Sequence, residues 1–306
     1  MKRLTLTVWL FVLGGASACS DSPATFQPLV TGALAQGLEA RVQVWAYRND
    51  DTVPLVRSDY VAQLTGATEV PCPVEGVSGA SPALCIHVDG PGPVGITLDS
   101  DRYGHIAVER PVVQTLALNV ATPNRTLAMV INSQTHQTLT IRGADGSAAE
   151  NLGAQYAFTG PVSVVAQANA DGISTFDLQA ADRGIATIAA VGHPEIAPLS
   201  IPVIDDLAFA KVKIFGDDQT IRLVPRTRVA FGLETYDTAG NFVVGNSYTL
   251  GELGPGITAD IHTNGLSFQT SPPVDDHAVV TYVDIRTGTL VQRFTVLRCF
   301  DAACNR

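Results

Sequence analysis

Short apolar stretches alternate with polar residues along most of this chain. The stretch ARVQVWAYR, from Ala40 to Arg48, has an apolar residue at every second position. Similar runs are separated by Gly, Asn, Asp and Pro, which are typical of tight turns. Alternation with a period of two predicts β-strands that bury one face. The most helix-like stretch after the N-terminus, from Val30 to Trp45, is interrupted by Gly32 and Gly37. The pattern therefore predicts an all-β fold.

Two strand patterns recur three times in the same order. The first is an alternating strand, a polar turn and another strand, with turns centred on Asn49-Asp50, Asp145-Gly146 and Ala239-Gly240. The second lies downstream and contains the strands VGITLDS, GIATIAAV and HAVVTYVD. Because both patterns repeat with a similar spacing, we predict three modules of roughly 90 residues. Seven or so short strands in a module of this size are typical of an immunoglobulin-like (Ig-like) sandwich.

Short motifs in the later modules resemble those of bacterial Ig-like modules. The stretch YDTAGNFVVGNSYTL, from Tyr236 to Leu250, is similar to the D-x-x-G-N-x-V-x-G hairpin of invasin- and intimin-type proteins. DRGIATIAAVG resembles the G-x-A-x-I-x-A strand near the end of such modules. The resemblance implies three tandem immunoglobulin-like β-sandwich modules, which we place at residues 28–113, 114–205 and 206–298. No long flexible linker separates them, so we expect a semi-rigid rod.

The N-terminus has the layout of an export signal. Lys2 and Arg3 precede an apolar run, and small residues then lead to Cys19. The run is shorter than the roughly 20 residues that span a membrane. Residues 16–19, ASAC, resemble the lipobox of bacterial lipoproteins, although that family prefers Leu at the position of Ala16. The resemblance implies a signal peptide at 1–18, a lipid on Cys19, a tether at 19–27 and a bacterial cell-envelope location. Ser20 favours the outer membrane under the sorting rule of enteric bacteria. The alternative is an ordinary cleaved signal.

The remaining cysteines form an even set. With Cys19 set aside, the chain has Cys72, Cys85, Cys299 and Cys304. An even number in an exported chain indicates disulfides, and sequence proximity pairs Cys72 with Cys85 and Cys299 with Cys304. The alternative, a metal site, lacks a second ligand pair beside CFDAAC. We expect residues 299–306 to be a tail that carries the second pair.

Charge and motifs argue against several kinds of function. The net charge of −10 disfavours nucleic acid and electrostatic docking on anionic lipid. The six histidines are scattered, and the sequence has no H-E-x-x-H or G-x-S-x-G motif. We therefore expect a non-enzyme without a cofactor, anchored in a membrane by its lipid, that binds an unknown protein or glycan or acts as a structural spacer. The alternative is a periplasmic or secreted enzyme, or a carbohydrate-binding accessory protein, on a β-sandwich.

Acidic pairs are candidate calcium ligands in the sequence. Asp205 and Asp206 lie at the predicted boundary between the second and third modules, and Asp217 and Asp218 follow closely. Ca²⁺ takes six to eight oxygen ligands, often from clustered carboxylates. The alternative is a set of solvated turn residues, because the preceding boundary near Pro111 has no acidic residue. We expect no metal site, and these four residues are the calcium candidates.

Overall fold

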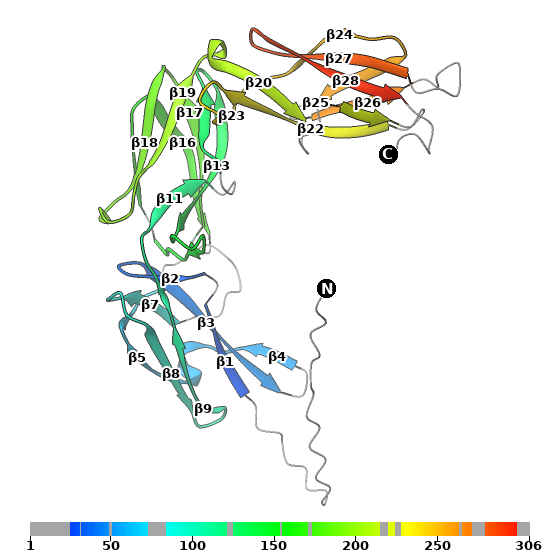
Figure 1. The fold of residues 1–306 in the computed structure, drawn as a ribbon. Coiled ribbons are helices and arrows are strands. Elements are labelled where there is room, and N and C mark those ends of the chain that lie inside the picture. Colours follow the sequence, from blue (N-terminus) through cyan, green and yellow to red (C-terminus); the bar gives the residue numbers. More distant parts are fainter. Residues whose placement is uncertain are drawn as a thin grey trace, which may run out of the picture.

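The computed structural model describes residues 25–298, apart from residues 31, 49–50, 73–83, 121–124, 154, 171–172, 215–219, 224–227, 263–264 and 271–278. Nearly all regular structure in these residues is β-strand, and the helical segments are two short 3₁₀ turns, Arg57–Asp59 and Asp206–Ala208. No helix in the described part of the chain is long and apolar enough to cross a membrane. The all-β prediction is confirmed (Figure 1).

The first sandwich consists of the strands before residue 114 (Figure 1). One sheet has the order β1 (Thr25–Val30), β3 (Glu39–Arg48), β7 (Leu84–Val88) and β6 (Ala67–Val70), with β4 (Asp51–Pro54) also paired to β3. The other sheet contains β5 (Val61–Thr65), β8 (Val94–Ser100) and β9 (Gly104–Arg110). A short parallel pair joins β2 (Leu34–Ala35) to β10 (Val112–Val113).

The second sandwich has the same plan. One sheet has the order β11 (Ala117–Val120), β13 (Gln134–Arg142), β17 (Ile173–Ala180) and β16 (Val162–Ala170), with β14 (Ala148–Ala149) paired to β13. The other contains β15 (Tyr156–Thr159), β18 (Gly184–Ala190), β19 (Leu199–Ile204) and β12 (Leu127–Val130). Strand β12 runs parallel to β19.

The third sandwich repeats this plan again. One sheet has the order β20 (Phe209–Ile214), β22 (Arg228–Asp237), β26 (Gly265–Thr270) and β25 (Ile257–His262), with β23 (Phe242–Val244) paired to β22. The other contains β21 (Thr220–Leu223), β28 (Leu290–Arg298), β27 (Val279–Thr287) and β24 (Thr249–Leu253). Strand β21 runs parallel to β28.

These strand orders define three Ig-like sandwiches. In Ig nomenclature, each has an A-B-E-D sheet facing a sheet with C, F and G, and a short A′ segment runs parallel to G. The two repeated sequence patterns correspond to equivalent strands. The first covers the B strands β3, β13 and β22, and the second covers the F strands β8, β18 and β27. The repeat inferred from the sequence is therefore a repeat of structure.

Each sandwich buries the inward residues of both its sheets. Three large clusters are centred on Leu84 and Ile96, on Leu178 and Ile188, and on Leu266 and Val283. Side chains from facing sheets interlock in such cores, and burying each large aliphatic side chain contributes about 1.5–3 kcal/mol. Strand β1 begins at Thr25, so it includes three residues that we expected in the tether.

In the first sandwich, a disulfide links Cys72, two residues after the end of β6, to Cys85 of the neighbouring strand β7. Cys72 and Cys85 are bonded, with their Cα atoms 5.2 Å apart. The pairing expected from sequence proximity for these two cysteines is present. Cys19, Cys299 and Cys304 lie outside the described residues, so the lipid on Cys19 and the second pairing remain predictions.

Tyr60 predicts an alkaline limit to the stability of the first sandwich. Its side chain is 4% exposed, its hydroxyl has no hydrogen-bond partner among the described residues, and burial raises its pKa to about 12. An unfolded tyrosine ionises near pH 10, so the folded state loses stability between pH 10 and about 12. We expect Tyr60→Phe to reduce this loss and to be neutral or stabilising by up to about 1 kcal/mol at pH 7. Urea unfolding of the parent and the Tyr60→Phe protein, at pH 7 and at alkaline pH, tests this. An equal loss of unfolding free energy in the two proteins at alkaline pH would contradict it.

Candidate functional site

The first and second sandwiches are joined by backbone hydrogen bonds. Ala33 donates its N–H to the carbonyl of Ala148 at 2.9 Å and accepts from the N–H of Glu150 at 3.0 Å, forming a parallel bridge to Ala149. A third bond runs from the N–H of Leu152 to the carbonyl of Glu39 at 3.0 Å. Ala35 and Leu38 of the first sandwich are also buried in the core of the second. The contact is therefore a packed interface, not a loose linker.

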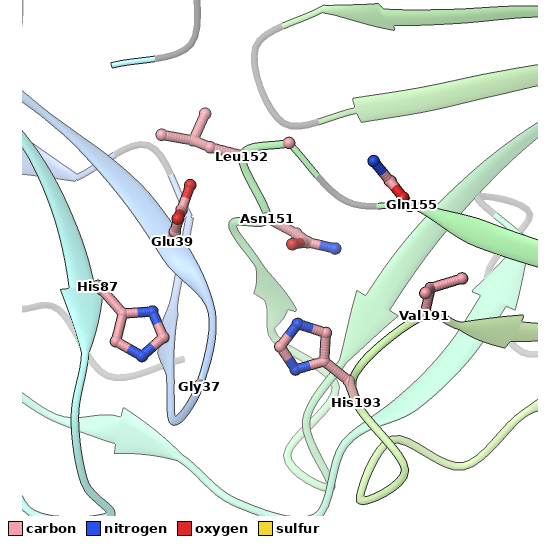
Figure 2. Close-up of a pocket in the computed structure, with 9 residues that line it drawn as sticks. Gly37, Glu39, His87, Asn151, Leu152, Gln155, Val191 and His193 are labelled. Atoms are coloured by element: carbon pink, nitrogen blue, oxygen red, sulfur yellow. The ribbon is translucent and has the colours of Figure 1, made fainter. Parts of the chain in front are cut away.

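A polar groove of about 270 Å³ lies at this first junction (Figure 2). The first sandwich contributes Gly37, Glu39 and His87, and Figure 2 shows the side chains of Glu39 and His87 facing residues of the second. Glu39 and His87 are opposite one another in the register of β3 and β7, which places them on one face of the sheet. The second sandwich contributes its loops after β14 and after β18, with Asn151, Leu152, Gly153, Gln155, Val191 and His193.

The groove offers hydrogen-bonding groups and little apolar surface. Glu39 and His87 are half-buried, Asn151 is buried, and the His193 ring lies 3.1 Å from the carboxylate of Glu195. A carboxylate, an amide and imidazoles can hold a small ligand rich in hydroxyl groups. None of the described residues that line the groove is a Ser, Thr or Cys that could act as a nucleophile. Its polar side chains are therefore suited to binding such a ligand.

The second and third sandwiches share one continuous sheet. Strand β23 of the third sandwich pairs in parallel with β12 of the second, with Leu127, Ala128 and Met129 opposite Phe242, Val243 and Val244. Phe242 also donates its N–H to the carbonyl of Thr126 at 2.8 Å. In Figure 1, β23 reaches from the third sandwich to the side of the second. Strand β12 thus has a neighbour on both sides, β19 and β23.

The turn before β23 explains how this strand is positioned. Asp237 is buried, and its Oδ1 accepts hydrogen bonds from the N–H groups of Ala239 at 2.9 Å and Asn241 at 2.7 Å. Gly240 has a φ of 85°, which glycine adopts without strain. Gly245 has a φ of 80°, and a Cβ there would collide with Ser133 of the second sandwich. The Asp, Asn and Gly residues of this motif therefore shape a strand that docks on its neighbour.

Apolar and ionic contacts reinforce the second junction. Ala128, Phe209 and Val243 form a small buried cluster between the two sandwiches. Arg125 of the second sandwich forms an ion pair with Glu234 of the third at 2.5 Å, and this partner raises the pKa of Arg125. The same guanidinium lies over the Phe242 ring, 5.4 Å from its centroid. Backbone hydrogen bonds, apolar packing and an ion pair thus all stabilise the junction between the second and third sandwiches.

The structure describes two of the four calcium candidates, Asp205 and Asp206. Asp205 forms an ion pair with Arg183, and together with Asp206 it lines a second hollow of about 280 Å³ at this junction. Asp217 and Asp218 lie outside the described residues. Within the described part of the chain, no three His, Cys, Asp or Glu side chains are grouped so that they could hold a metal ion. The positive charge beside the Asp205 carboxylate is thus the guanidinium of Arg183.

Sequence reasoning missed the groove. His87 and His193 are 106 positions apart by their numbers and belong to different sandwiches, yet both line it. His87 lies on strand β7 and His193 in the loop after β18, and neither belongs to a motif, so the sequence gives no signal that the two residues line one groove. The repeated turns did identify the segments from which β14 and β23 are built, but not their contacts with the preceding sandwich.

Comparison with known proteins gives structural likeness at low similarity. No protein-family model matches the sequence, and no curated protein matches it. A solved structure of the Escherichia coli adhesin FdeC matches at 15% identity and a TM-score of 0.25, covering 94% of this chain and 99% of that one.

Two further solved structures match at the same level. The surface-layer protein SbsC (domains 4–9) has 13% identity and a TM-score of 0.26, and invasin, a bacterial integrin-binding protein, has 14% and 0.22. Each match covers 90% of this chain, and this chain spans 48% of the first and 60% of the second. These scores carry no argument about function, so the Ig-like assignment rests on the strand order.

Proposed function

We propose that this chain is a lipid-anchored protein of the bacterial cell envelope, with non-catalytic Ig-like modules that bind a partner or act as a structural spacer. Residues 1–18 are the signal peptide, Cys19 carries the lipid, and residues 19–24, before strand β1, form the tether. The modules are 25–113, 114–205 and 206–298, with 299–306 as a tail. The outer membrane is the proposed location, and a protein or glycan the proposed partner. No nucleic acid and no cofactor are involved.

The observation that carries the proposal is backbone pairing across both junctions. Ala33 pairs with residues 148–150, and β12 pairs with β23. Contacts between domains of one chain often leave them free to move, whereas buried and hydrogen-bonded contacts restrict that motion. A stiff series of sandwiches suits a protein that holds a surface at a fixed distance from a membrane. The groove at the first junction is then a candidate binding surface.

Replacing Cys19 with Ser tests the anchor. The substitution removes the thiol that the lipid requires, so we expect the protein to move from the membrane fraction to the soluble fraction of the envelope. The acidic chain supplies no electrostatic attraction to anionic lipid that could hold the variant on the membrane in place of the lipid. Ser20→Ala keeps the cysteine and should remain with membranes. Fractionation followed by immunoblotting measures both, and a Cys19→Ser protein that stays in the membrane fraction would overturn the anchor.

A further inference from the structure

Both junctions are built from the same two parts. The donor part is a short strand that follows the hairpin after strand B: β14 in the second sandwich and β23 in the third. The acceptor part is the A′ segment of the preceding sandwich, which is Ala33 beside β2 at the first junction and β12 at the second. The pairing is parallel in both cases. The chain therefore uses one docking geometry twice.

Each end of the chain has an unused part of this kind. Strand β4 is the donor of the first sandwich, because it pairs with β3 as β14 pairs with β13. Strand β21 is the acceptor of the third sandwich, because it runs parallel to β28 as β12 runs parallel to β19. Among the described strands, β4 pairs only with β3 and β21 pairs only with β28.

The two unused parts lie at opposite ends of the series of sandwiches. The first residue of β3, Glu39, bonds to Leu152 of the second sandwich, whereas its last residues pair with β4. Figure 1 shows β4 near the start of β1 and away from β2. Strand β21 pairs with β28 up to its last residue, Arg298. In the two earlier sandwiches, the chain passes into the next sandwich at the equivalent position. One end therefore presents a donor and the other an acceptor.

The exposure of the donor strand β4 indicates that it lacks the partner that its counterparts have. Val53 of β4 lies opposite Ala46 in its hairpin and is 51% exposed. Its counterparts are Ala149, opposite Ile141, and Val243, opposite Thr235, which are 8% and 2% exposed. Unpaired strand edges are templates for strand addition from another chain.

We propose that copies of this protein associate head to tail, with β4 of one copy adding in parallel to β21 of the next. Such a contact joins two different surfaces, so it builds an open series, not a closed dimer. Within the chain the docking is intramolecular and favoured by a high effective concentration, so contact between copies is weaker. The association itself is independent of the lipid anchor and of the proposed function.

Sedimentation velocity of the full-length Cys19→Ser protein tests the proposal without detergent. We expect the average mass to rise with concentration and to pass the mass of a dimer. Val53→Asp places a charge on the donor strand and should weaken association at least tenfold. Val61→Asp is the matched control, because Val61 is 62% exposed on another strand of the same sandwich. Both positions are exposed, so both variants should keep the thermal unfolding midpoint of the parent.

A mixing experiment tests the direction of assembly. The Val53→Asp protein keeps its acceptor, so it should end growing series and lower the average mass when added to the parent protein, whereas Val61→Asp should not. Three results would overturn the proposal. The first is a parent protein that stays monomeric at about 1 mM, which corresponds to very weak association. The second is an average mass that stops rising at the mass of a dimer. The third is equal association of the Val53→Asp and Val61→Asp proteins.

Discussion

Replacing Val243 with Asp should open the junction between the second and third sandwiches while both sandwiches stay folded. Val243 is 2% exposed and packs with Ala128 and Phe209 in the cluster between them. The residues of that cluster are apolar and offer a carboxylate no hydrogen bond, so we expect a cost of at least about 3 kcal/mol. The third core, centred on residues such as Leu266 and Val283, does not include Val243. The change should therefore act on the contact between sandwiches.

Hydrogen exchange at one amide measures this opening. The Phe242 N–H bonds to Thr126 across the junction, so its exchange should speed up by a hundredfold or more in the Val243→Asp protein. The Leu266 amide should stay protected. Val291→Asp is the control, because Val291 is 52% exposed in the same sandwich. Unchanged protection of Phe242 would show that the shared sheet does not hold the two sandwiches together.

Removing the Cys72–Cys85 disulfide should produce the second large effect. The bond closes a loop with a sequence separation of 13, and loop-entropy arguments assign about 3 kcal/mol to a closure of this size. We expect the Cys72→Ala, Cys85→Ala protein to lose roughly that amount of unfolding free energy in the first sandwich. Urea unfolding can be followed by the fluorescence of Trp45, the one tryptophan after the signal peptide.

Two comparisons make the disulfide result specific. Reducing the parent protein with dithiothreitol should cause a similar loss, because it breaks the same bond. The Cys299→Ala, Cys304→Ala protein should unfold at the same urea concentration as the parent when Trp45 is the reporter. A double alanine variant at 72 and 85 that is as stable as the parent would mean that the closed loop constrains the unfolded chain little.

Local pattern was enough to predict the strands and their repeat. Alternation in ARVQVWAYR and in VGITLDS arises because a strand buries every second side chain, and this requirement appears directly in the sequence. The turn at Asp237 to Asn241 could also be predicted, because its Asp, Gly and Asn have local conformational roles. These features depend on residues close together in the chain.

Contacts between sandwiches could not be predicted in this way. The motif from Tyr236 to Leu250 indicated a hairpin, but nothing in it shows that Val243 is buried against Ala128. Likewise, Glu39, His87 and His193 line one groove because two sandwiches meet with a particular orientation. Residues so far apart in the chain leave no periodic signal.

The sequence by itself determined the strand content, the three-fold repeat and the turns, because neighbouring residues decide which face of a strand is buried and where the chain can reverse. Only the tertiary structure decided that the short strands β14 and β23 join successive sandwiches, and that Asp205 faces Arg183. It also decided that β4 and β21 lack the partners that their counterparts have among the described strands. These are relations between surfaces, and they exist only after each sandwich has folded.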